Sequence, residues 1–270
     1  MLSRLTEKQR QWALIIFFSV VTLAVLGYRL YHSFLPTAST YIADKIPKEI
    51  YQSIGQSALE QLDETEFSDS ELDVTTQDAI RTDFNQLINE LNLDPDRFTL
   101  HMRHWEGQMN AFALMDGSIV ITDALVNNLN AVLDSNAPHD SEQALNTQAI
   151  RAVLLHEIGH IEHNHLMEHT IRVSLFYISA SLIFGDISVV SQILLEGSTM
   201  GLNIAYSRDL EVEADQYAAD QLTKLYGSPA ALIQALTVLY QESEQENKSE
   251  PDLHWLSTHP NLEARLEGIK

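Results

Sequence analysis

The chain has 270 residues and a formal net charge of −22, which argues against binding to nucleic acid, because such proteins hold phosphate through cationic patches. It contains no cysteine, so disulfides, thiol catalysis and a lipid-anchored cysteine are excluded. This length suits one globular domain with an N-terminal appendage.

The first predicted element is a membrane-spanning helix. Residues 11–28 carry no charge and are mainly apolar, and a run of this length can cross the core of a bilayer. Arg4, Lys8 and Arg10 precede it against a single acid, Glu7. The positive-inside rule then puts the N-terminus in the cytoplasm. In a bacterium this predicts an inner-membrane anchor with the domain that follows it in the periplasm.

A cleaved signal peptide is the alternative, and the protein would then be secreted. The apolar core of a signal peptide is usually shorter, about 7 to 15 residues, and ends at small residues. Here Tyr28, Arg29 and Tyr31 follow the run and resemble an interfacial anchor, although residues 37–39 could be cut. We favour the uncleaved anchor. The predicted divisions are an anchor (1–30), a linker (31–44) and a catalytic domain (45–270).

The scaffold is predicted from the spacing of apolar residues. Such residues recur at helical spacing in 46–58 and in 80–91, so two helices precede the sheet. In 98–104 they alternate with polar residues, which indicates a strand. A further helix is expected over 125–133. The polar stretch 134–146 then predicts a loop.

The most specific motif is His156-Glu157-Ile158-Gly159-His160. Residues four apart on a helix share a face, so both imidazoles can bind one ion. A hydrolytic zinc takes three protein ligands and keeps a fourth position open, and Glu157 can deprotonate the water that binds there. An apolar stripe on the opposite face favours this interpretation over incidental histidines on a surface helix. The stripe consists of Ile150, Leu154, Ile158 and Ile161.

A third ligand must come from elsewhere in the chain. The metzincin pattern continues with a glycine and a third histidine, and it is excluded because His163 and Leu166 hold those positions. A later helix offers Glu211 as the candidate third ligand. Asp215, one turn on, can accept a hydrogen bond from a zinc-bound imidazole. Glu213 points in another direction and is expected to be solvated.

Residues 173–195 form a second apolar region between these two blocks. Gly185-Asp186 divides it into halves that are too short to cross a bilayer. We favour a helical pair buried in the domain over a hairpin that dips into the membrane. Farther on, Ser228-Pro229 predicts the start of a helix that continues to about Glu244.

The other histidines near the motif are not predicted to bind metal. His163 lies about 10 Å along the helix axis from His156, at about 1.5 Å per residue, so it cannot easily join the same ion. His165 and His169 lie farther still. The sequence therefore predicts one Zn²⁺ per chain and no second metal site.

Four blocks together resemble the HtpX and CAAX prenyl endopeptidase family of gluzincins, particularly its periplasmic BepA-like branch. They run in family order from about residue 45 to the C-terminus. One departure is Met115-Asp116, where relatives usually carry Pro-Gly or Gly-Gly. The blocks are Asn110–Thr122, the HEIGH motif with His165 nine residues after its first histidine, Ser207–Asp215, and Ser257–Pro260 followed by Arg265.

The resemblance implies zinc held by His156, His160 and Glu211, with Glu157 as the base. It implies an α+β, mostly helical zincin-type domain with a small antiparallel sheet, here preceded by a transmembrane helix. His165 matches a family position, which favours a structural hydrogen bond.

The resemblance also implies a strand that binds substrate. The segment 118–122 is similar to the edge strand on which zincins lay an extended peptide. The expected partners are accordingly polypeptides. Candidate contacts are Asn110, Ser118, Ile119 and Val120.

His259 has two interpretations. In the BepA-like branch the histidine of this block lies near the metal and can restrict access to it, which makes His259 a candidate gate or auxiliary ligand. The alternative is a turn histidine before Pro260, which would be the first residue of the last helix.

The expected activity is peptide-bond hydrolysis without a covalent intermediate, in which Glu157 deprotonates the water and later protonates the leaving amine. Arg208, Tyr206 and His259 are candidate stabilisers of the developing oxyanion. The expected substrates are unfolded or misassembled envelope proteins. One alternative is a chaperone-like binding protein with little proteolysis. A weaker one is a zinc hydrolase that acts on small molecules.

Overall fold

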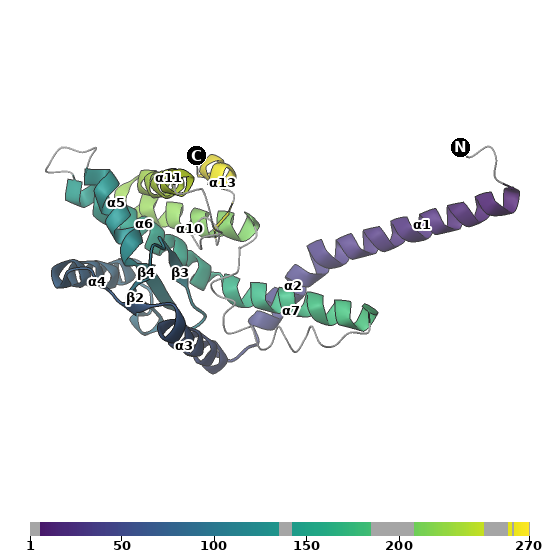
Figure 1. Ribbon diagram of the computed structural model, residues 1–270, viewed down its shortest axis with the longest axis horizontal. Coiled ribbons are helices and arrows are strands. Elements are labelled where there is room, and N and C mark those ends of the chain that lie inside the picture. Colours follow the sequence, from purple (N-terminus) through teal and green to yellow (C-terminus); the bar gives the residue numbers. More distant parts are fainter. Residues whose placement is uncertain (1–5, 135–141, 185–207, 246–258, 261, 270) are drawn as a thin grey trace.

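The computed structural model describes residues 6–134, 142–184, 208–245, 259–260 and 262–269. A mostly helical body holds a small sheet, and a long N-terminal helix projects from it (Figure 1). This architecture confirms the predicted mostly helical α+β class. The predicted break at Gly185-Asp186 and the candidate Tyr206 lie outside the described residues.

The sheet is mixed rather than antiparallel. β2 pairs in parallel with β4, and the other two pairings are antiparallel. β2 coincides with the strand predicted over 98–104, which is confirmed. The strand order is β1-β2-β4-β3. The strands are β1 (Ser68–Asp69), β2 (Thr99–His104), β3 (Ala111–Ala113) and β4 (Ser118–Thr122).

The prediction that residues 118–122 form the edge strand is wrong. This strand, β4, lies between β2 and β3, and all of its residues are buried. The cause is the hairpin that folds β3 back onto its outer side, through Gly117 at φ 91°. On this side of the described sheet the edge strand is β3, which follows Asn110. The candidate contacts that lose the edge position are Ser118, Ile119 and Val120.

Asp116 closes the hairpin turn between β3 and β4. Its carboxylate accepts hydrogen bonds from the backbone N–H and the hydroxyl of Ser118, both at 3.0 Å. The N–H of Gly117 donates to the carbonyl of Leu114 at 3.1 Å. A Cβ on Gly117 would lie 1.9 Å from the carbonyl oxygen of Arg97. The turn is therefore formed without the Pro-Gly or Gly-Gly of the relatives.

Helices cover both faces of the sheet. Ile119 and Ile121 of β4 belong to one apolar core with α4 (Val74–Glu90), α5 (Asp123–Asp134) and α6 (Glu142–Glu162). Val120 belongs to a second core on the other face, with α3 (Lys48–Thr65). Burial on both faces explains why β4 is an unbroken run of buried residues.

The predicted helices are present, but α3 buries a different face from the one predicted, and α6 begins earlier than predicted. Those at 80–91 and 125–133 fall in α4 and α5, and the helix after Ser228 is α11 (Ala230–Gln245). The predicted loop 134–146 is shorter, because α6 begins at Glu142. α3 buries Gly55 against Asp116 of the β3–β4 turn, and it leaves Ile50 47% exposed. Its buried residues are Gly55, Ala58 and Leu62.

The N-terminal segment is one unbroken helix. It consists of α1 (Glu7–Arg29), a π-helical turn (Leu30–Phe34) and α2 (Leu35–Ala43). This helix is long and apolar enough to cross a membrane, and no residue of α1 is buried. The predicted linker 31–44 is therefore helical.

α2 packs against α7 (His165–Phe184), which runs beside it outside the body (Figure 1). Leu35, Ser39 and Ala43 are the buried residues of α2. On α7, residues 168–175 are half-buried and Ile178 is 42% exposed. Residues 173–184 are thus helical, and the four of them whose side chains are described, 173–175 and 178, are not fully buried as predicted.

Candidate metal centre

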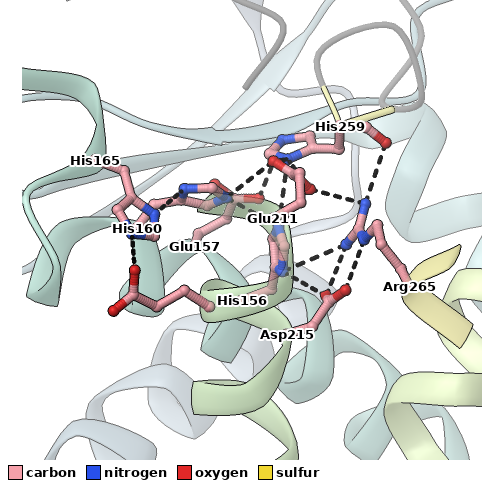
Figure 2. A network of polar contacts seen from close by, with 9 residues as sticks. His156, Glu157, His160, His165, Glu211, Asp215, His259 and Arg265 are labelled. Carbon is pink, nitrogen blue, oxygen red and sulfur yellow. Dashed lines mark hydrogen bonds and ion pairs between the residues drawn. The ribbon is translucent and has the colours of Figure 1, made fainter. Parts of the chain in front are cut away.

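Two helices bring the predicted zinc ligands together. His156 and His160 lie one turn apart on α6, and Glu211 lies in the first turn of α10 (Arg208–Tyr226). All three side chains are buried. They converge on one point, together with His259 (Figure 2).

Gly159 allows the two helices to approach closely. A Cβ at this position would lie 3.1 Å from the Cα and the carbonyl oxygen of Ala214 and 3.3 Å from the Cβ of Tyr217. Both of these residues belong to α10. Because Gly159 precedes His160 directly, the contact also sets how far Glu211 stands from the imidazoles.

The donor atoms lie at the spacing of a tetrahedral zinc site. Nε2 of His160 is 3.0 Å from Nε2 of His156. The carboxylate of Glu211 is 3.5 Å from Nε2 of His156 and 3.4 Å from Nε2 of His160. A zinc ion with bonds of about 2.0–2.1 Å separates its tetrahedral ligands by about 3.3 Å. Imidazole nitrogen with one carboxylate oxygen is also a ligand set that zinc prefers. The residues therefore fit this metal.

His259 completes the set as a fourth donor. Its Nδ1 is 3.2 Å from Nε2 of His156 and 3.1 Å from Oε1 of Glu211. The side chain is fully buried, so the structure favours the gate or auxiliary-ligand interpretation over the turn histidine. Pro260 does not begin the last helix, since α13 starts at Leu262.

Asp215 and Arg265 support the ligands from behind. Asp215 contacts Nδ1 of His156 at 2.9 Å, so it occupies the supporting position predicted for it. The guanidinium of Arg265 bonds to the carboxylate of Asp215 at 2.6 and 2.7 Å, to Glu211 at 2.9 Å and to the carbonyl of His259 at 3.1 Å. One buried cation thus holds two ligands and one supporting carboxylate (Figure 2).

Sequence reasoning gave Arg265 no role. Arg265 follows the fourth block, but 54 residues separate it from Glu211 along the chain. The candidate Arg208 is instead exposed at the start of α10. The guanidinium of Arg265 faces two carboxylates only because the fold places α13 (Leu262–Gly268) beside α10.

Mutual contacts set the ionisation of the cluster. Burial opposes protonation of His156, but Asp215 and Glu211 outweigh it and raise the pKa of His156 to about 9. Burial lowers the pKa of His160 well below its usual value. Burial acts to raise the pKa of Glu211, yet the three histidines hold it well below the usual range. In the same way Arg265 keeps the pKa of Asp215 at about 2. Both carboxylates are therefore anionic and available to support a cation.

Glu157 lies beside the donors without joining them. Its side chain is 1% exposed, and its Oε1 is 3.6 Å from Nε2 of His259. Glu157 lies on α6 between His156 and His160, so the same helix carries its carboxylate and two of the donors. The role of Glu157 as a base stays a prediction.

His165 makes the hydrogen bond that the resemblance implied. Its Nδ1 is 2.9 Å from Nδ1 of His160, and its Nε2 is 3.3 Å from Oε2 of Glu213. Glu213 is 52% exposed, but it is not simply solvated as predicted, because it also contacts Nδ1 of His163 at 3.2 Å. The sequence did not reveal the turn after α6, which brings His163 and His165 toward Glu213 on α10.

A cleft of about 640 Å³ adjoins the metal cluster. Its wall includes His160 at one end, the last residue of β3, Ala113, and the turn that follows it. Asp44 and Tyr51, at the junction of α2 and α3, also line it. Asn110 is buried, and its carbonyl accepts from the N–H of Thr122, so it holds the start of β3 to β4.

Comparison with known proteins identifies the family of the chain. Residues 75–270 match Peptidase family M48. The chain is a member of this family. It is also 27% identical over 194 residues, 69% of each chain, to Metalloprotease LoiP of Escherichia coli (strain K12). The resemblance to HtpX-type zinc metallopeptidases is confirmed, and every residue of the cluster lies inside the region matched to family M48.

Proposed function

We propose that this M48 metallopeptidase is a zinc-dependent endopeptidase that uses Glu157 as its general base. The observation that carries the proposal is the convergence of His156, His160 and Glu211, with the Glu157 carboxylate carried beside them on α6. A bound zinc ion supplies Lewis-acid chemistry: it lowers the pKa of a coordinated water and polarises a peptide carbonyl.

The residues of the chain handle the protons. Glu157 accepts the proton of the attacking water on a carboxylate oxygen and later delivers it to the leaving amine. Asp215 accepts from Nδ1 of His156 and fixes that imidazole with Nε2 toward the ion. Arg265 compensates the charge of Glu211 and Asp215 in a site with no exposed surface.

His259 acts in this proposal as a gate. Its Nδ1 stands 3.1–3.2 Å from Nε2 of His156 and from Glu211, where the water of a hydrolytic site would bind. Water and the peptide carbonyl can reach the ion only after His259 leaves that position. The resting chain is then latent, and His259→Ala should raise the initial rate of casein cleavage several-fold. Unchanged cleavage in His259→Ala, with His101→Ala as the matched control, would contradict the gate.

The substrate in this proposal is an extended, unfolded polypeptide. β3 lies at the edge of the described sheet and ends at the cleft that reaches His160. A peptide can pair with such an edge through its backbone, which makes recognition tolerant of sequence. Because α1 is exposed and its apolar run 11–28 follows Arg4, Lys8 and Arg10, we infer a membrane anchor, a periplasmic domain and envelope proteins as substrates.

Glu157→Gln is the direct test. The variant should bind one zinc like the wild type, because Glu157 is no ligand, and it should lose casein cleavage by at least about a hundredfold. His160→Ala should lose both zinc and cleavage. Cleavage retained in Glu157→Gln would overturn the assignment of the base.

A second candidate function is favoured by the closed position of His259. A chain that spends most of its time latent can hold unfolded envelope proteins and cleave them rarely. Complementation of an envelope defect separates the two functions. Rescue by Glu157→Gln as strong as by the wild type indicates binding, whereas loss of rescue indicates proteolysis.

A further inference from the structure

A second group of metal-binding side chains lies on the other side of His160. His163, His165 and Glu213 offer donor atoms that all lie within 4.8 Å of one another. Nδ1 of His163 is 3.2 Å from Oε1 of Glu213, and Nε2 of His165 is 3.3 Å from Oε2. Two imidazole nitrogens and a carboxylate are typical ligands of Zn²⁺.

A break in the helix creates this arrangement. Two residues apart on one helix, His163 and His165 would point about 200° apart at 3.6 residues per turn. Asn164 adopts φ 53°, the left-handed region that Asn tolerates, and it separates α6 from α7. The two imidazoles stack instead, with ring centroids 5.4 Å apart and an interplanar angle of 19°. Their nitrogens can therefore face the same carboxylate.

The group is open to solvent, unlike the buried cluster around His259. The side chains of His163 and Glu213 are 36% and 52% exposed, whereas His165 is 1% exposed. An ion can reach the first two ligands directly and keep water in its remaining positions. The net charge of −22 also attracts cations to the surface.

We propose that His163, His165 and Glu213 form a second, inhibitory site for Zn²⁺. The inference extends the proposed function by giving it a regulator, and only its inhibitory part depends on that function. Neither the family match nor the sequence motifs predict it, because Glu213 reaches the histidines only through the break at Asn164.

The inhibition follows from the shared position of one proton. His160 offers Nε2 to the catalytic cluster, so its Nδ1 carries the proton and donates to Nδ1 of His165, 2.9 Å away. His165 then keeps its own proton on Nε2 and donates it to Glu213. An ion that binds Nε2 of His165 moves this proton to Nδ1, where it faces the N–H of His160. The hydrogen bond that orients His160 is then lost.

The two sites should therefore oppose each other. Loss of a partner that orients a ligand typically costs about 10–100-fold in metal affinity or activity. Coupling between binding sites is reciprocal, so zinc at the catalytic site should weaken the second site by the same factor. The second site should fill only when zinc is in excess.

Zinc titration of the full-length chain in detergent tests the site. We expect calorimetry to show a second, weaker Zn²⁺ per chain in the wild type. His163→Ala and Glu213→Gln should each weaken this second binding by at least about tenfold. Asp220→Asn, which removes an exposed acid elsewhere on α10, should bind the second ion like the wild type. A wild type that binds only one ion, or a second binding step that is unchanged in both variants, would overturn the site.

Cleavage measurements test the inhibition separately. Excess zinc should reduce casein cleavage by the wild type at the concentration that fills the second site, and it should leave His163→Ala uninhibited. Equal inhibition of both proteins would refute the coupling. If neither protein cleaves at any zinc concentration, the proposed function fails, while the calorimetric result still decides whether the second site exists.

Discussion

Two regions of the molecule differ in which side chains they bury: the contact between α6 and α10, and the N-terminal helix α1. At the junction His156, Glu157, His160 and Glu211 are fully buried, although every one of them is polar. Along α1 no residue is buried, although most are apolar. The first region places charge where water is absent, and the second leaves apolar surface where water would be unfavourable.

The difference shows which solvent each region is built for. A buried charge is tolerated only when it is paired and hydrogen-bonded, and Arg265 with its two carboxylates satisfies this requirement. An exposed apolar helix is tolerated when a lipid bilayer takes the place of water. If this comparison is right, substitutions at the junction should lower the free energy of unfolding of the body strongly, whereas equivalent substitutions in α1 should not.

The largest effect is expected at Arg265. Arg265→Leu leaves Glu211 and Asp215 buried without their cation, which should lower the free energy of unfolding by about 3–5 kcal/mol. Chemical denaturation of the metal-free protein measures this loss. The control is Arg81→Leu, which removes an exposed pair with Asp78 and should cost at most about 0.5 kcal/mol. Similar losses in both variants would contradict the comparison.

A smaller effect is expected at Gly159. In Gly159→Ala the new Cβ presses on the backbone of Ala214, so α10 must shift by a few tenths of an ångström. Overpacking of this kind costs about 1–3 kcal/mol, and the displaced Glu211 should also weaken zinc binding in a chelator competition. The control is Gly27→Ala in α1, where no atom lies within 4 Å of the new Cβ. Zinc affinity that is unaltered in Gly159→Ala would show that this contact does not set the ligand spacing.

A local effect is expected where α2 meets α7. Leu35 is 1% exposed there. Leu35→Ala should loosen the packing of α2 against α7 without changing the free energy of unfolding of the body. Hydrogen exchange should speed up in both helices and stay unchanged in α6 and α10. Faster exchange that spreads into α6 would mean that the pair is an integral part of the catalytic body.

The smallest effect on the body is expected from deletion of residues 1–29. Because no residue of α1 is buried, the catalytic body should keep its unfolding free energy within about 0.5 kcal/mol and retain casein cleavage. The protein should move from the membrane fraction to the soluble fraction. Loss of the folded body after this deletion would show that α1 does more than anchor.

Local patterns were enough to predict much of the fold and half of the site. The apolar stripe of α6 and the four-residue spacing of His156 and His160 can both be recognised within a single helix. Glu211 and Asp215 were chosen by the same reasoning on a second helix. The strand at 98–104 followed from strict alternation along β2. Each of these features depends on residues within about two turns or one strand of each other.

The errors arose where distant segments meet. β3 is three residues long, Ala-Phe-Ala, which is too short to show alternation, so its pairing at the outer side of β4 left no sequence signal. Arg265 approaches Asp215 from 50 residues away. The pairing of Glu213 with His163 depends on one left-handed residue, Asn164. None of these contacts has a period or a spacing that could reveal it.

The unbroken helix from Glu7 to Ala43 sets the distance between the membrane and the cleft beside His160. If the lipid boundary lies near Arg29, the fourteen residues that follow in the helix, 30–43, rise about 20 Å at about 1.5 Å per residue. Ala43 and Asp44 line the cleft beside His160, so under the proposed function a helix that stands upright would hold the scissile bond at about that height above the bilayer. Such a ruler would spare tightly embedded segments and reserve cleavage for chains that extend well clear of the lipid.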